Sequence, residues 1–172
     1  MRTRSTPVVL AVIAAASAAC QTSKPLSPAD EAAVRAADSV YHAALSAGNL
    51  DAAVAFFTAD ATVMPPNAPP VHGTDAIRQH FSGLIAGTNF TVAVKSERVS
   101  GDGNLAYNIG SYHSTGTLKD SVKTPIPPED GKYLQVLLRQ PNGSWKAVAD
   151  IWNANAAPAA PTPPKAPARR GH

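Results

Sequence analysis

The stretch GKYLQVLLRQPNGSWKAVADIWN, residues 131–153, decides the fold of this chain. It contains two runs, 132–140 and 144–153, in which apolar and polar residues alternate as they do in β-strands. Pro141-Asn142-Gly143 separates the runs, and Asn-Gly between two alternating runs is a strong signal for a β-hairpin. The sequence therefore predicts that the folded part of the chain ends in an antiparallel pair of strands.

Further extended runs precede this hairpin. Residues 89–99 and 105–117 alternate as strands around a Gly101–Asn104 turn, and a polar loop with three prolines follows at 119–131. Thr62–Met64 forms a shorter run. The proline-rich segment that follows it, up to Pro70, is long enough to form a rim or a lid.

Three helical segments come before most of these strands. The first begins at Ser27-Pro28, where Ser27 can cap and proline suits the first helical position, and it ends at Gly48. The second is expected over residues 50–57, and the third from Gly73 to Gly87. On the first helix the residues at helical spacing are Val34, Ala37, Tyr41, Ala44 and Leu45, while Arg35, Asp38 and His42 fall outside that stripe. This order of elements predicts an α+β fold with helices on one face of an antiparallel sheet.

Both ends of the chain differ from this middle part. Residues 1–19 contain two arginines, an apolar run from Val8 to Ala16 and then small residues, which is the pattern of a signal segment that is removed on export. That run is about half of the ~20 apolar residues that a membrane-spanning helix needs. Residues 154–172 are rich in alanine and proline and are expected to be disordered. The expected organisation is therefore a signal at 1–19, a tether at 20–26, one domain at 27–153 and a tail at 154–172.

The single cysteine, Cys20, stands where the signal segment ends. Ser17-Ala18-Ala19-Cys20 resembles a bacterial lipobox, which implies lipidation at Cys20 and a place in the periplasm or at the outer membrane. The usual leucine three positions before the cysteine is replaced by Ser17. The alternative is ordinary cleavage after Ala16-Ser17-Ala18, which would leave a soluble periplasmic or secreted protein.

The charges argue against nucleic acid as a partner. The whole chain has a formal charge of +3, but residues 21–153 hold 10 of the cations and all 12 acids, a formal charge of −2. The excess of cations therefore lies at the ends of the chain. A nucleic-acid-binding domain would concentrate lysine and arginine on one face.

Three segments, taken in order, carry a resemblance to a family. AGNLDAAVAFFTADATVMPP (47–66), PPVHGTDAIRQHF (69–81) and the hairpin at 131–153 resemble the SnoaL-like domain of the nuclear-transport-factor-2-like superfamily. The resemblance implies a cone, in which a curved antiparallel sheet wraps around the long first helix and encloses a pocket. It also implies frequent dimerisation through the sheet. Relatives include ketosteroid isomerases, polyketide cyclases, epoxide hydrolases and binding modules, so the fold alone does not define the function.

Asp150 is the leading candidate for a functional side chain. It lies between apolar residues in the last strand, where partial burial would raise its pKa and suit it to act as a general base or an anchor. The alternative is an exposed acid at the end of a strand, or one that pairs with a nearby cation. Tyr41 is the second catalytic candidate, and its hydroxyl needs a partner if it is buried. The candidates for lining a pocket are Tyr41, Phe57, His72, Asn108, Tyr112, Tyr133, Gln135 and Trp152.

The catalytic set of the isomerase relatives looks incomplete in this sequence. In those relatives a tyrosine of the first helix helps to stabilise an enolate oxygen, together with a base and a second acidic donor. No matching pair of buried acids is evident here, since Asp60 is expected to cap or turn the chain. His42 is expected at the surface and His80 on the polar face of its helix. No histidines have metal-ligand spacing, so neither a metal nor a cofactor is expected.

Three hypotheses remain open. The first is an exported, lipid-anchored domain that forms a homodimer and binds a small apolar or mixed-polarity molecule. The second is an enzyme of the isomerase, cyclase or hydrolase type with Asp150 as base and Tyr41 or Tyr133 as donor. The third is an assembly module that dimerises through its sheet.

Overall fold

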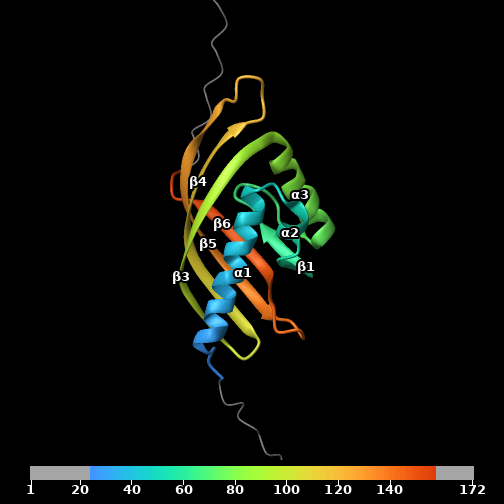
Figure 1. The fold of residues 1–172 in the computed structure, drawn as a ribbon, viewed down its shortest axis with the longest axis vertical. Helices are drawn as coiled ribbons and strands as arrows, with labels where there is room; N and C mark the ends of the chain where they lie inside the picture. Colours follow the sequence, from blue (N-terminus) through green and yellow to red (C-terminus); the bar gives the residue numbers. More distant parts are fainter. Residues whose placement is uncertain (1–23, 158–172) are drawn as a thin grey trace, which may run out of the picture.

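The computed structural model describes residues 24–157, and Figure 1 shows a curved sheet wrapped around one long helix. The predicted signal segment, Cys20 and most of the predicted tail lie outside the described residues. The helices are α1 (Pro28–Ser46), α2 (Leu50–Val54) and α3 (Thr74–Gly87). Helix α1 crosses the concave face of the sheet, and α2 and α3 lie to one side of it (Figure 1). The predicted α+β fold is confirmed.

Six strands form one sheet in the order β2-β1-β6-β5-β4-β3. Their bounds are β1 (Phe57–Met64), β2 (Val71–His72), β3 (Thr88–Asp102), β4 (Leu105–Leu118), β5 (Pro125–Arg139) and β6 (Trp145–Ala154). All neighbouring strands are antiparallel except β1 and β6, which run parallel. The parallel pair arises because the chain leaves β1 through β2 and α3, builds the rest of the sheet from its far edge, and returns beside β1 with β6.

Several elements begin or end at other residues than the sequence predicts. The second helix ends at Val54, and Phe57, which was expected at its end, begins β1. Asp60 lies within β1 and does not cap a helix. Strand β5 begins at Pro125, inside the predicted loop. Prolines are tolerated there because this part of β5 pairs only with β4 and so forms a sheet edge.

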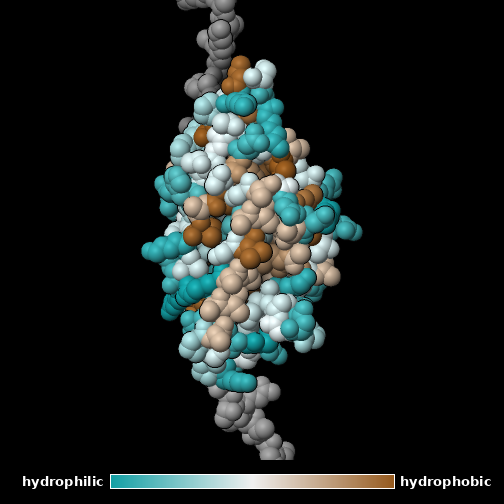
Figure 2. Space-filling model, viewed as in Figure 1, coloured by the Kyte–Doolittle hydropathy of each residue, from teal (hydrophilic) through white to brown (hydrophobic). Residues whose placement is uncertain are grey.

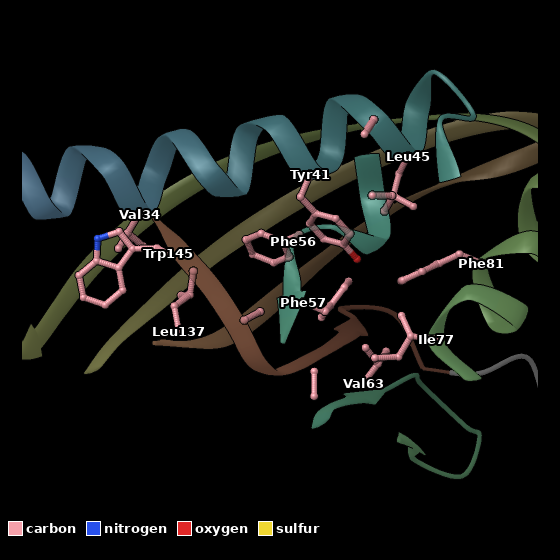
Figure 3. Close-up of a cluster of buried hydrophobic side chains, with 14 of the residues drawn as sticks. Val34, Tyr41, Leu45, Phe56, Phe57, Val63, Ile77, Phe81, Leu137 and Trp145 are labelled. Carbon is pink, nitrogen blue, oxygen red and sulfur yellow. The ribbon is translucent and has the colours of Figure 1, made fainter. Parts of the chain in front are cut away.

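The core lies between α1 and the concave face of the sheet, and aromatic rings dominate it (Figure 3). Tyr41 stacks on Phe56 at a centroid distance of 4.6 Å and meets Phe57 edge-on at 5.3 Å. Phe57 in turn packs 6.1 Å from Phe81 of α3. These contacts fix α1, the short segment between α2 and β1, β1 itself and α3 around the ring of Tyr41. Aromatic pairs of this kind each add about 1 kcal/mol beyond the area that they bury.

The solvent face of α1 is also apolar. Figure 2 shows a band of apolar residues running along this helix, and Val40 on it is 63% exposed. The band consists mainly of exposed alanines, and it continues without a break into the buried stripe through Ala37 and Ala44. Within residues 24–157 no helix is long and apolar enough to cross a membrane.

Candidate functional site

A cavity of about 300 Å³ lies between α1, α3 and the concave face of the sheet. Its walls are mostly apolar and aromatic, and they include Tyr41, Leu45, Phe81, Phe90, Tyr112, Ile126, Tyr133 and Trp152. Three ionisable groups also contribute to the lining: His42 from α1, Glu129 from β5 and Asp150 from β6. An apolar cavity with a few convergent polar groups is the usual form of a small-molecule site.

Asp150 lies at the inner end of this cavity and is only 3% exposed. The hydroxyl of Tyr41 lies 3.4 Å from its Oδ2, at the long end of hydrogen-bond range, and donates to it. Burial, with a further contribution from the negative charge of Asp38, raises the pKa of Asp150 to about 7. His42 and Tyr41 act in the opposite direction and limit the rise. A carboxyl group that titrates near neutrality can accept or donate a proton at physiological pH.

Asp38 is a second buried carboxylate, 1% exposed, on α1. The hydroxyl of Tyr133 donates to its Oδ2 at 2.7 Å, and Nδ1 of His42 lies 3.1 Å from its Oδ1. Burial by itself would raise the pKa of Asp38, but the His42 ring beside its Oδ1, the charge of that ring and the hydrogen bond from Tyr133 hold the pKa below its ordinary value. Since the carboxylate and the Asp38 carbonyl that contact Nδ1 only accept hydrogen bonds, Nδ1 of His42 carries a proton.

The sequence-based prediction that the domain has no pair of buried acids is therefore wrong. The prediction that His42 lies at the surface is also wrong, because its side chain is 13% exposed and lines the cavity. The reason is the composition of α1. Its alanines leave the apolar stripe too broad to define one buried face, so Asp38 and His42 could not be placed by periodicity.

A bulge in the β5–β6 ladder directs Asp150 into the cavity. The register shifts between Val136 and Leu137 of β5, opposite Ala149 and Ala147 of β6. Before the bulge Trp145 and Ala147 face the core; after it the inward residues are Asp150 and Trp152. Strict alternation counted from Trp145 would place Ile151 in the core, but Ile151 is 40% exposed on the outer face.

Two glycines hold the tyrosines of the cavity in place. Gly110 of β4 pairs with Tyr133 of β5, and Tyr112 of β4 pairs with Gly131 of β5. A Cβ atom at Gly131 would lie 2.1 Å from the Tyr112 ring, and one at Gly110 would lie 2.4 Å from the Tyr133 ring. Each ring therefore lies across the glycine of the neighbouring strand. This arrangement brings the Tyr133 hydroxyl to Asp38 and the Tyr112 hydroxyl to Glu129, 2.6 Å from its Oε1.

The predicted site residues separate into two groups. Tyr41, Tyr112, Tyr133, Asp150 and Trp152 come together on the cavity wall. The other four do not contribute to that wall: Phe57 lies in the aromatic core, His72 is exposed on β2 beside Thr62, and Asn108 and Gln135 are buried below it.

Asn108 and Gln135 form a polar layer under the cavity. The Asn108 amide donates to the Gln135 side-chain carbonyl at 3.1 Å and accepts from the Ser96 hydroxyl at 2.5 Å. Both side chains are fully buried. These bonds link β3, β4 and β5 across the concave face, so the pair supports the floor on which Tyr133 and Asp150 lie.

Glu129, Phe81 and Phe90 are wall residues that sequence reasoning missed. Glu129 was assigned to a loop, so its place on a strand facing the cavity could not be recognised. His80, expected on a polar face, is half-buried and lies 6.5 Å from the Trp152 ring, and burial lowers its pKa. Within the described part of the chain no group of three or more His, Cys, Asp or Glu side chains is placed to hold a metal ion.

Comparison with known proteins agrees with this architecture. A family model described as the SnoaL-like domain matches residues 39–144, and the chain belongs to this family. A ketosteroid isomerase-like protein from Erwinia carotovora atroseptica superposes with a TM-score of 0.69 at 20% identity, over 76% of this chain and all of that one.

A nuclear transport factor 2-like superfamily protein from Salmonella enterica superposes with a TM-score of 0.65 at 15% identity, over 84% of this chain and 98% of that one. At this identity the two structures establish the fold and nothing more. No curated protein matches the chain.

Proposed function

We propose that this domain binds a small, largely apolar molecule in the cavity between α1 and the sheet. The observation that carries the proposal is the composition of the wall: aromatic rings on several sides, with Asp150, His42 and the tyrosine hydroxyls as its convergent polar groups. The apolar part of a ligand would pack against the rings, while a carbonyl or hydroxyl group would be oriented by the Asp150–Tyr41 pair.

Binding can be tested with 2-naphthalenemethanol, a neutral probe with two fused rings, by following tryptophan fluorescence, because Trp152 lies in the wall. Ser114→Phe would place a ring in the cavity and is expected to abolish binding. His113→Phe is the matched control, since its side chain is exposed on the opposite face of β4. Equal affinity of the two variants for the probe would contradict the proposal.

A second candidate function is proton transfer on the bound molecule, in the manner of an isomerase or a hydrolase. The pKa of Asp150, raised to about 7 by burial, favours it, because a general base is most effective when its pKa is near the working pH. Tyr41, which donates to Asp150 in the free domain, would turn that hydrogen bond to the developing oxyanion. Tyr133 donates its hydroxyl proton to Asp38 and would act as a second donor only after releasing that contact.

This second function can be tested by following deuterium exchange from D2O into the methyl group of 2-acetylnaphthalene by NMR. Wild-type protein is expected to accelerate exchange, and Asp150→Asn to reduce the rate by a factor of roughly 10² to 10⁴. Asp60→Asn, at an exposed strand position, is the control. A wild-type protein that binds the ketone without accelerating exchange would leave binding as the function.

We further propose that the domain is exported and held at the cell envelope by a lipid on Cys20. Support comes from the sequence pattern of residues 1–20, which lies outside the described residues. Intact mass spectrometry of the mature protein from a detergent extract is the test. A chain that begins at Cys20 with an added diacylglyceryl or triacylglyceryl mass is expected, and an unlipidated chain that begins at Ala19 would refute the proposal.

Self-association is proposed to use the convex face of the sheet. This face carries exposed apolar side chains: Leu105 (49%), Ile109 (36%), Leu134 (40%), Leu138 (38%) and Ile151 (40%). Clusters of exposed apolar residues on a sheet are typical of protein–protein contacts. A homodimer built in this way leaves the cavity open on the other face, so it is compatible with ligand binding and equally with a purely structural role.

A further inference from the structure

The ionisable side chains around the cavity are mostly carboxylates, and this excess of negative charge indicates which class of ligand the cavity can bind. The inference drawn from it below rests on the proposed binding function. The residues that form the wall include Glu129 and Asp150 but no lysine or arginine, and Asp38 adds a third carboxylate directly behind Tyr133. The histidine of the wall, His42, already contacts Asp38.

Two cations on or next to elements that border the cavity, Lys119 and Arg35, are engaged elsewhere. Lys119 lines a neighbouring groove, and its Nζ donates to the carbonyl of Ile85 at 2.7 Å, near the end of α3. Arg35 of α1 donates to the carbonyl of Ser96 at 2.6 Å, on the inner side of β3. Neither residue belongs to the cavity wall. A carboxylate or phosphate in the cavity would therefore meet carboxylates without a compensating cation, which is costly where water is excluded.

Glu129 stands at the open end of the cavity, opposite the buried Asp150. It is exposed, and it lies directly across from Ser114 in the β4–β5 ladder. The Tyr112 hydroxyl donates to its Oε1 at 2.6 Å, which fixes the direction of the carboxylate. Within residues 24–157 its second oxygen has no hydrogen-bond partner and is available to a ligand.

Aromatic rings share the cavity wall with this carboxylate. Tyr112 contacts it directly, and Phe90, Tyr133 and Trp152 complete the same wall. Aromatic rings attract cations through the negative potential of their faces. A carboxylate combined with several rings is a suitable environment for an organic ammonium group, which is less strongly hydrated than an inorganic cation.

We propose that the natural ligand of this cavity is a hydrophobic molecule that carries a basic nitrogen, with its ammonium group held by Glu129 and the Tyr112 ring at the mouth and its apolar part packed against the other rings of the wall. Its apolar part extends inward toward Asp150. The same wall discriminates against molecules whose polar group is a carboxylate, a phosphate or a sulfate.

Three probes with the same ring system and different charges test this proposal: 2-naphthylmethylamine, 2-naphthalenemethanol and 2-naphthoate. Their affinities are measured at pH 8 by isothermal titration calorimetry. The amine is expected to bind roughly three- to fivefold more tightly than the alcohol, the scale of a partly exposed ion pair with a cation–π contact, and the naphthoate most weakly. Glu129→Gln is expected to remove the preference for the amine over the alcohol.

Asp130→Asn is the matched control. Asp130 is the next residue of β5, exposed and paired with His113 outside the cavity, so the preference is expected to persist in that variant. Circular dichroism checks that both variants fold.

Equal binding of amine and alcohol by the wild type, tighter binding of the naphthoate, or a preference that survives Glu129→Gln would each overturn the inference while the binding function stands. Failure of all three probes to bind would overturn the binding function and this inference with it.

Discussion

Replacing Asp150 with asparagine is expected to make the stability of the domain much less dependent on pH. The folded state holds the Asp150 proton more tightly than the unfolded chain, because burial raises the pKa from 3.8 to about 7. The stability that goes with the protonated carboxyl is fully present below pH 3.8 and is lost progressively as the pH rises to about 7. A shift of roughly 3 units corresponds to about 4 kcal/mol at 1.36 kcal/mol per unit.

The measurement is urea unfolding of wild type and Asp150→Asn, followed by tryptophan fluorescence between pH 4.5 and 8. The difference in unfolding free energy between the two proteins is expected to shift in favour of the variant by about 3 kcal/mol over this range. The value is smaller than the full shift of about 4 kcal/mol because, at pH 4.5, the wild type has already lost part of the stability that comes from the protonated Asp150. Using the change with pH removes any constant contribution of the asparagine side chain itself. Asp60→Asn, at an exposed strand position, is expected to show no such change.

A difference that stays constant from pH 4.5 to 8 would refute the reasoning. It would mean that Asp150 is ionised in the folded domain at low pH, and that Tyr41 and His42 compensate its burial fully. The candidacy of Asp150 as a general base near neutrality would then lose its physical basis, while the cavity and its aromatic wall would be unaffected.

Three further predictions concern other parts of the structure. Gly131→Ala is expected to destabilise the domain by about 2 kcal/mol or more, since its Cβ would lie 2.1 Å from the Tyr112 ring; Gly83→Ala, where the space is open, is expected to be neutral or mildly stabilising in urea unfolding. Asp38→Asn is expected to reduce the loss of stability that the domain shows below pH 4. Because the pKa of Asp38 is lowered in the folded state, its carboxylate stabilises the wild type at higher pH, and this stabilisation disappears as acid protonates it. Acid titration followed by circular dichroism measures the difference. Leu134→Lys, on the convex face, is expected to convert the proposed dimer to a monomer in analytical ultracentrifugation without changing probe affinity, and a dimer that persists would contradict the proposed interface.

The sequence predicted the hairpin, the three helices and the family resemblance because each depends on local or ordered patterns. The Asn-Gly turn is an example: Gly143 adopts a positive φ of 85°, which glycine tolerates and most residues do not. The capping box at Ser27 and Asp30 is likewise set by neighbours in the sequence. Such features require no knowledge of what packs against them.

The buried acid pair could not be predicted by the same means. Asp38 becomes acceptable in the core only because Tyr133, 95 residues further along the chain, donates to it, and His42 supplies a second contact. Periodicity on α1 carries no information about that tyrosine. A polar residue looks misplaced on an apolar stripe until its partner is known, and for this reason Asp38 was assigned outside the stripe.

Asp150 shows a different limit of sequence reasoning. Alternation predicts that Asp150 lies on the same face of the strand as Trp152, and the structure agrees. Alternation alone would extend that face back to Lys146. The register shift opposite Val136 and Leu137 instead makes it continuous with the inward-facing Trp145. Without the bulge, Ile151 would point into the cavity and the carboxyl group into solvent. A single extra residue in one strand therefore separates an apolar, chemically inert cavity from one that contains an ionisable group with a pKa near 7. Bulges are frequent beside functional sites, and this one is the structural feature on which both proposed activities of Asp150 depend.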